Sequence, residues 1–237
     1  SMYPGHMGVS SIKVTGRGDN IPLMYDVIFE GTNTFNTPIN YTIYKTTENI
    51  EASYTCQVQE EIQGSMKILY EECTGNNIEL LGDPISSGTI TKGEGITTLK
   101  SDEILLTTES GNIVYYYVVF EYPNLDESQN DDMGSSISGV INITEGNEYQ
   151  NPNITTTPTL VSGSNGWYTS ASITTNITSQ TGNYTTEYCI TTEESCTPNT
   201  DASISNNSFS VSLTSNTNAQ KVCVRVEDEY SQVMEGC

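Results

Sequence analysis

The sequence SYTCQVQEEIQGSMKILYEEC, residues 53–73, predicts an antiparallel hairpin closed by a disulfide bond. At its centre is the turn-like Gln63-Gly64-Ser65, and strand-like residues flank this turn on both sides. Opposite residues of an antiparallel pair have a constant sum of residue numbers, so Cys56 and Cys73 face each other across this turn. Cα separations of about 4.5–5.5 Å between opposite residues match disulfide geometry. We therefore predict a Cys56–Cys73 bridge.

The constant sum of residue numbers also applies to the other four cysteines. It places Cys189 opposite Cys196 and Cys223 opposite Cys237, each pair across its own hairpin. We predict these two bridges; the alternative is 189–223 with 196–237, between neighbouring strands. A zinc site is the competing use of the cysteines, but the chain has no CxxC motif and no usable histidine. Disulfide bonds indicate an oxidising compartment, so we expect an extracellular or cell-surface protein.

Apolar and polar residues alternate with period two along most of the chain, and no segment has a 3.6-residue stripe over three turns. We therefore expect an all-β protein built from β-sandwiches. After residue 158, about 80 residues repeat the same pattern in compact form. The strands expected before that point are 11–15, 23–29, 39–45, 53–59, 66–71, 85–90, 103–108, 113–122 and 136–144.

A polar segment at residues 147–158, NEYQNPNITTTP, contains two prolines and little that could pack, so we predict an interdomain linker. It separates an N-terminal β-sandwich, residues 9–146, from a C-terminal one, residues 159–237. Residues 1–8 resemble a cloning remnant and are predicted to be flexible. Any export signal or anchor is expected to lie outside this sequence.

The charge balance excludes several classes of partner. The chain has 30 Asp and Glu against 8 Lys and Arg, a formal net charge of -22. Such a field repels phosphate backbones and anionic lipid, so we expect no nucleic-acid partner and no direct membrane binding by this segment.

Histidine chemistry is effectively excluded, because the single histidine, His6, lies in the segment that we predict to be flexible. A glycoside hydrolase needs two carboxylates across a sugar-sized cleft, and nothing in the sequence marks such a pair. We therefore expect a protein that is not an enzyme and has no cofactor other than calcium. A catalytic or accessory domain of a glycoside hydrolase is the remote alternative.

The acidic loop at residues 124–132 is a candidate calcium site. Hard oxygen ligands at this density can hold Ca²⁺, which extracellular modules bind at about 10⁻⁴–10⁻³ M. The spacing is not that of an EF-hand, and a solvated hairpin loop is the alternative. The candidate ligands are Asp126, Glu127, Asn130, Asp131 and Asp132.

Three aromatic residues are candidate ligand-binding residues, because exposed Tyr and Trp are common platforms for sugar rings and protein partners. Trp167 stands at the head of the C-terminal domain. Strand alternation puts Tyr115 and Tyr117 on one face and Tyr116 on the other, so at least one of these faces is expected to pack in the core. We predict Trp167, Tyr115 and Tyr117 as the binding set.

Two stretches resemble known families. The run Gly166-Trp167-Tyr168-Thr169-Ser170 before an alternating strand, and VCVRVEDEYSQV at 222–233, resemble bacterial immunoglobulin-like repeats of surface proteins. Residues 115–144 are similar in rhythm to secreted Gram-positive matrix proteins of the camelysin and TasA type. The resemblances imply an immunoglobulin-like C-terminal sandwich and a jelly-roll or immunoglobulin-like N-terminal one.

From these observations we expect a secreted or surface-attached protein of a Gram-positive bacterium that acts in adhesion. Its partner would be a glycan or a protein on a host or neighbouring cell, bound through loops of the sandwiches. The alternative is a structural subunit of an extracellular matrix fibre or pilus, whose partner would be another copy of itself.

Overall fold

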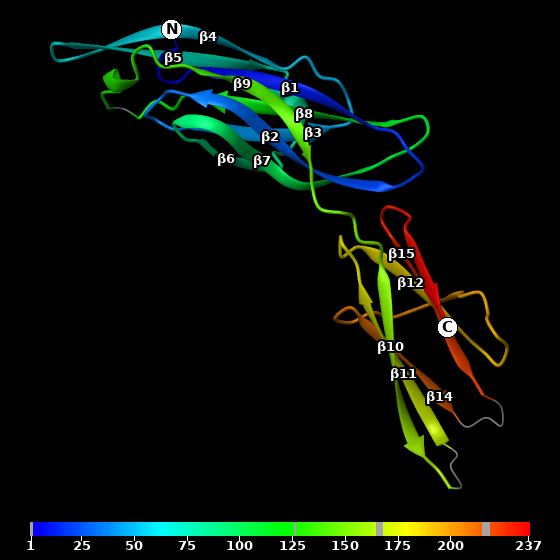
Figure 1. Ribbon diagram of the computed structural model, residues 1–237. Coiled ribbons are helices and arrows are strands. Elements are labelled where there is room, and N and C mark those ends of the chain that lie inside the picture. The colour runs from blue at the N-terminus through cyan, green and yellow to red at the C-terminus, as the bar shows by residue number, and fades with distance from the viewer. Residues whose placement is uncertain (1, 126, 165–167, 215–218) are drawn as a thin grey trace. The chain divides into compact units, whose positions relative to one another are not determined.

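The computed structural model describes residues 2–125, 127–164, 168–214 and 219–237. It divides the chain into two compact units, residues 1–148 and 149–237 (Figure 1). The described residues form strands apart from loops and two short 3₁₀ helices, Ile78–Leu81 and Asn130–Asp132. The predicted all-β class is confirmed. Among the described residues, no helix has the length and apolarity to cross a membrane.

The N-terminal unit is a jelly roll, because its first eight strands form nested antiparallel pairs, as in one long hairpin that has been rolled up. The ninth strand, β9 (Ile137–Glu145), pairs with the second edge of β2. The sequence left a jelly roll and an immunoglobulin-like fold open here, and the strand pairing decides for the jelly roll. The nested pairs are β1 (Met7–Gly16) with β8 (Asn112–Glu121), β2 (Pro22–Asn33) with β7 (Gly93–Leu106), β3 (Ile39–Thr46) with β6 (Ser86–Ile90), and β4 (Ser53–Gln63) with β5 (Met66–Asn76).

Two sheets, β1-β8-β3-β6 and β7-β2-β9, face each other across the core of this unit. Their inward residues alternate along each strand, and Val27, Ile43 and Val118 are fully buried between them. The β4–β5 hairpin pairs with neither sheet and lies along the β1 side (Figure 1).

A polar network crosses this core. The hydroxyl of Tyr116 donates to Glu103 Oε2 at 2.7 Å, and Tyr25 donates to the Tyr116 oxygen at 2.6 Å. Lys45 Nζ lies 2.5 Å from the same Glu103 oxygen. Glu103 is 7% exposed, so its charge depends on these partners.

We predict that Lys45→Met lowers the free energy of unfolding by about 3 kcal/mol, because it leaves the buried Glu103 carboxylate without its cation. Urea denaturation at neutral pH measures the loss. The double variant Lys45→Met/Glu103→Gln should recover part of it. Equal stability of Lys45→Met and the native protein would contradict the prediction.

The N-terminal residues 2–8 are packed, so the prediction of a flexible N-terminus is wrong. His6 Nδ1 lies 2.7 Å from Glu71 Oε2 on β5, and the Glu71 N–H donates to Pro4 O at 2.8 Å. The Gly5 N–H donates to Tyr122 O at 2.7 Å. Partners on β5 and after β8 therefore hold this segment, and sequence alone does not reveal them.

The C-terminal unit is a sandwich with the strand order of an immunoglobulin-type fold, in which the first, second and fifth strands pack against the other four. Its core brings Val224 and Val226 together with Phe209, Val211 and Ile177. One sheet is β10 (Asn153–Ser162), β11 (Tyr168–Thr178) and β14 (Ser208–Thr214), and the other is β13 (Thr200–Asp201), β12 (Tyr184–Thr191), β15 (Lys221–Asp228) and β16 (Val233–Gly236).

The predicted linker at 147–158 is wrong for its second half, because β10 begins at Asn153 and pairs with β11. Pro158 is compatible with this strand, since β10 ends its sheet and a missing N–H is tolerated at an edge. Before β10, the Tyr149 hydroxyl donates to the carboxylate of Asp228. Tyr149 is thereby fixed to the second unit.

All three predicted disulfide bonds are present. Cys56 and Cys73 are register partners in the β4–β5 hairpin, as the arithmetic requires. Cys189–Cys196 differs from the expectation, because Cys196 lies in the loop between β12 and β13 and no hairpin strand forms around it. The strand partner of Cys189 is Cys223 on β15.

The turn after β15 suggests a stabilising substitution. Asp228 Oδ1 accepts hydrogen bonds from the N–H groups of Tyr230 and Gln232, and Ser231 between them has a φ of 58°. A left-handed conformation costs a residue with a Cβ about 1–2 kcal/mol relative to glycine.

We therefore predict that Ser231→Gly raises the free energy of unfolding by about 1 kcal/mol. Chemical denaturation measures the gain, and Ser231→Ala, which keeps the Cβ, should show none. A loss of stability in Ser231→Gly would contradict the assignment of strain to this position.

Candidate functional site

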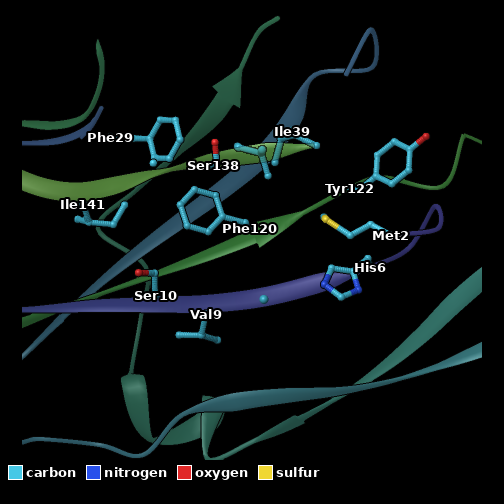
Figure 2. A pocket seen from close by; sticks show the side chains of 13 residues that line it. Met2, His6, Val9, Ser10, Phe29, Ile39, Phe120, Tyr122, Ser138 and Ile141 are labelled. Carbon is cyan, nitrogen blue, oxygen red and sulfur yellow. The ribbon is translucent and has the colours of Figure 1, made fainter. Parts of the chain in front are cut away.

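An apolar cleft opens in the jelly roll where β1 and β9 meet. β1 ends one sheet and β9 ends the other, so the two strands border the seam of the sandwich. A cavity of about 270 Å³ lies in this seam (Figure 2). We call it the seam cleft. It is lined by Met2, His6, Gly8, Val9, Ser10, Phe29, Ile39, Phe120, Tyr122, Ile137, Ser138, Gly139 and Ile141.

Two phenylalanine rings form the centre of the seam cleft. Phe29 comes from β2 and Phe120 from β8, so each sheet supplies one ring. Their centroids lie 5.9 Å apart with an interplanar angle of 63°. Figure 2 shows them beside Ile39 and Ile141, with the aliphatic side chains around the rings. The cleft therefore presents aromatic and aliphatic surface.

Small residues at the rim keep the seam cleft open. Gly8 and Ser10 occupy inward positions of β1, where they face Phe120 and Val118 across the β1–β8 pairing. A Cβ added to Gly8 would meet no atom within 4 Å. Larger residues at these positions would cover the rings, so the sequence leaves this part of the core accessible.

Glycine is required on the β9 side of the cleft. Gly139 pairs with Gly31 of β2, and a Cβ at Gly139 would lie 2.7 Å from the Phe29 ring and 2.4 Å from Glu30 O. The Phe29 ring therefore lies against the backbone at Gly139, with no side chain between them. This close approach fixes the ring at the floor of the cleft.

One end of the seam cleft is polar. There Met2 lies between His6 and Tyr122 (Figure 2). The Tyr122 hydroxyl donates to Asp132 Oδ2 at 3.2 Å. Burial, together with the negative charge of Asp132, raises the pKa of Tyr122 to about 12, so this phenol stays protonated at neutral pH.

The chemistry of this lining favours binding of apolar groups. Among the described residues that line the cleft, His6 is the one basic side chain, and none is acidic. His6 is itself paired with Glu71. Burial of apolar groups against such a surface yields about 25 cal/mol per Å².

The predicted tyrosine platform is wrong for Tyr117, which is 2% exposed. Its hydroxyl accepts a hydrogen bond from the Ile50 N–H at 2.5 Å and donates to Asn49 Oδ1 at 3.3 Å. The loop between β3 and β4 therefore covers this face of β8, which strand alternation alone does not show. Tyr115 is half-buried, and Trp167 lies outside the described residues.

Among the described residues of the acidic loop, the carboxylates of Glu127, Asp131 and Asp132 do not come together in a group that could hold a metal ion. Glu127, Asn130 and Asp131 are exposed, whereas Asp132 is buried, and Asp126 lies outside the described residues. The calcium site therefore stays a prediction for the exposed side chains.

Asp132 serves the fold and is not free to act as the predicted calcium ligand. Its carboxylate accepts hydrogen bonds from the N–H groups of Asn36 at 2.5 Å and Thr37 at 3.1 Å, besides the Tyr122 hydroxyl. It thereby ties the β8–β9 connection to the β2–β3 turn. Burial alone would raise the pKa of Asp132, but the hydrogen bonds from Thr37, Asn36 and Tyr122 lower it below its ordinary value.

We predict that Asp132→Asn lowers the free energy of unfolding by about 2 kcal/mol at neutral pH, because hydrogen bonds to a charged group are lost. A carboxyl group whose pKa is lowered by folding stabilises the protein above its unfolded pKa and loses that effect as pH falls through the folded value. The difference between native protein and variant should therefore shrink below about pH 4. Urea denaturation across this range measures it, with the exposed Asp131→Asn as control. A difference that is independent of pH would contradict the assignment.

No protein-family model, curated protein or solved structure matches this chain. The resemblances to immunoglobulin-like repeats and to matrix proteins of the camelysin and TasA type therefore stay predictions. For the first of them, Gly166 and Trp167 lie outside the described residues. The function is inferred from the geometry of this chain.

Proposed function

We propose that this is a non-catalytic extracellular protein that acts in adhesion by binding an extended polypeptide segment at the seam cleft. The observation that carries the proposal is the cavity of about 270 Å³ beside the buried Phe29 and the half-buried Phe120, between two strands that each end a sheet. The proposal replaces the predicted binding through tyrosines and loops, because Tyr117 is buried.

An extended segment suits this site for a geometric reason. A strand added to a free sheet edge gains main-chain hydrogen bonds, and its alternate side chains point to one face. At β9 these side chains would enter the seam cleft beside Ile141 and the two rings. Ser138 and Gly139 are exposed and have small or no side chains, so a partner can approach this edge closely.

The net charge supports a partner with basic residues, and the disulfide bonds support an extracellular site of action. The net charge of -22 favours partners that carry basic residues near their apolar ones, and this attraction weakens with salt. The three disulfide bonds support a site of action outside the cytosol.

We predict that Gly8→Leu weakens binding at the seam cleft, because its side chain fills the space over the rings without a clash at Cβ. Arrays of immobilised peptides with alternating apolar residues and flanking lysines provide the ligands. Ser11→Leu is the matched control, because it places the same side chain on the opposite, exposed face of β1. Gly8→Leu should weaken binding by roughly tenfold or more, about 1.4 kcal/mol, and Ser11→Leu should not.

Two results would contradict the proposal. One is binding that Gly8→Leu and the native protein share with equal affinity. The other is a glycan array that gives saturable binding while the peptide arrays give none. Thermal denaturation of both variants checks that each remains folded.

A structural subunit of a fibre is the second candidate, because the strand received at β9 could come from another copy of the chain. The edge at β9 favours it, since the described structure leaves that edge without a second neighbour. Light scattering after size exclusion separates the two functions. Growth of the native protein into large assemblies, blocked in Gly8→Leu, would favour the fibre over the adhesin.

A further inference from the structure

Three cysteines of the C-terminal unit lie in one row across three strands. Cys189 on β12 is the register partner of Cys223 on β15, and Cys223 is bonded to Cys237, directly after β16. Cys196, the disulfide partner of Cys189, comes from the adjoining loop. Two disulfide bonds therefore lie side by side on one face of this sheet.

The sulfur atoms of the two bridges approach each other closely. The Sγ atoms of Cys189, Cys196 and Cys223 all lie within 4.8 Å of one another. Since every one of them is bonded to another sulfur, none is available as a thiolate ligand for a metal. Thiol–disulfide exchange proceeds by attack of a thiolate on a neighbouring disulfide sulfur, and such proximity provides the geometry.

Exposure differs along the cluster and sets the order of attack. Cys223 is 2% exposed and Cys189 is 9% exposed, so neither is readily reached from solvent. Cys196 is half-buried and Cys237 is exposed. An external thiol can therefore enter at Cys196 or Cys237, while Cys223 is accessible mainly to its neighbour Cys189.

We propose that these four cysteines form a thiol–disulfide exchange site at which a small thiol interconverts two disulfide pairings. The observed pairing is 189–196 with 223–237, and the second is 189–223 with 196–237. The register pairing of Cys189 with Cys223 makes the 189–223 bond of the second pairing compatible with the native sheet.

Exchange proceeds in three steps that return the thiol. An external thiolate attacks Cys196 Sγ, forms a mixed disulfide and releases the Cys189 thiolate. The Cys189 thiolate attacks Cys223 Sγ, forms the 189–223 bond and releases the Cys237 thiolate. Cys237 then attacks Cys196 Sγ in the mixed disulfide, forms the 196–237 bond and releases the external thiolate. Each step breaks one S–S bond and forms one, so there is no net oxidation.

Charge selects the class of thiol. Glu193 and Glu194 lie exposed in the loop that the 189–196 bond closes, and Glu235 lies two residues before Cys237. Lys221 and Arg225 are the nearby cations, and Arg225 is already paired with Glu227 and Glu235. Neutral and cationic thiols should therefore react faster than anionic ones, and the preference should fall with salt.

The experiment maps the disulfides of the folded protein after treatment with a low level of 2-mercaptoethanol and an alkylating quench. Digestion with trypsin and a glutamate-specific protease leaves each of the four cysteines in its own peptide, because Glu193, Glu194, Lys221, Arg225 and Glu235 separate them. Mass spectrometry then identifies the linked pairs. We expect peptides linked through 189–223 and through 196–237 to appear. Cys56–Cys73 is not part of the described cysteine cluster, so it should keep its pairing.

Comparison of thiols adds a second readout. Cysteamine should form the new pairing severalfold faster than mercaptoethanesulfonate at low salt, and the two rates should converge at high salt. Retention of only the original pairings, or reduction without the new pairing, would overturn the proposal. New pairings that include Cys56 or Cys73 would also overturn it, because they indicate global unfolding.

A single variant tests the central step alone. Cys237→Ser leaves Cys223 unpaired beside the 189–196 bond, so 189–223 peptides should appear without any added thiol. If this variant does not fold, the disulfide map of the native protein still decides. A folded Cys237→Ser that retains 189–196 alone would contradict the proposal.

Discussion

The close packing of β9 against β2 determines the shape of the N-terminal unit. Gly31 and Gly139 are opposite each other in this pairing, and the Phe29 ring occupies the space that their missing side chains leave. A jelly roll must bury the inner faces of both sheets, but the small residues of β1 and β9 leave a cavity beside the buried Phe29 and the half-buried Phe120. The cavity beside these rings is therefore a consequence of glycine and serine at the rim.

In each unit a buried aspartate fixes a loop by accepting hydrogen bonds from the same kinds of donor. Asp132 accepts from two backbone N–H groups and the Tyr122 hydroxyl, and Asp228 accepts from two backbone N–H groups and the Tyr149 hydroxyl. The chain has 30 acidic side chains and 8 Lys or Arg, so cations are too few to pair with its acids. Backbone amides and tyrosine hydroxyls take this role. Burial, together with the aspartate that each hydroxyl contacts, raises the pKa of Tyr122 and of Tyr149.

Local patterns in the sequence predict much of the fold. Period-two alternation identifies most strands, and the constant sum of residue numbers accounts for Cys56–Cys73 and Cys223–Cys237. The predicted pairing of Cys189 with Cys196 is also confirmed, but it rests on a hairpin that does not form. The start of β7 at Gly93 is missed, because its glycines and a left-handed Asp102 interrupt the alternation. The seam cleft and the buried Tyr117 are not predictable in this way. They depend on contacts between residues that lie far apart along the chain.

The most direct test of the seam cleft as a binding site is hydrogen exchange of the backbone amides with and without a bound peptide. A partner strand that adds to β9 or β1 should protect amides at the seam, within residues 8–10 or 137–141. Amides of β12 and β15 should not change. Protection confined to regions outside the N-terminal seam would contradict the account.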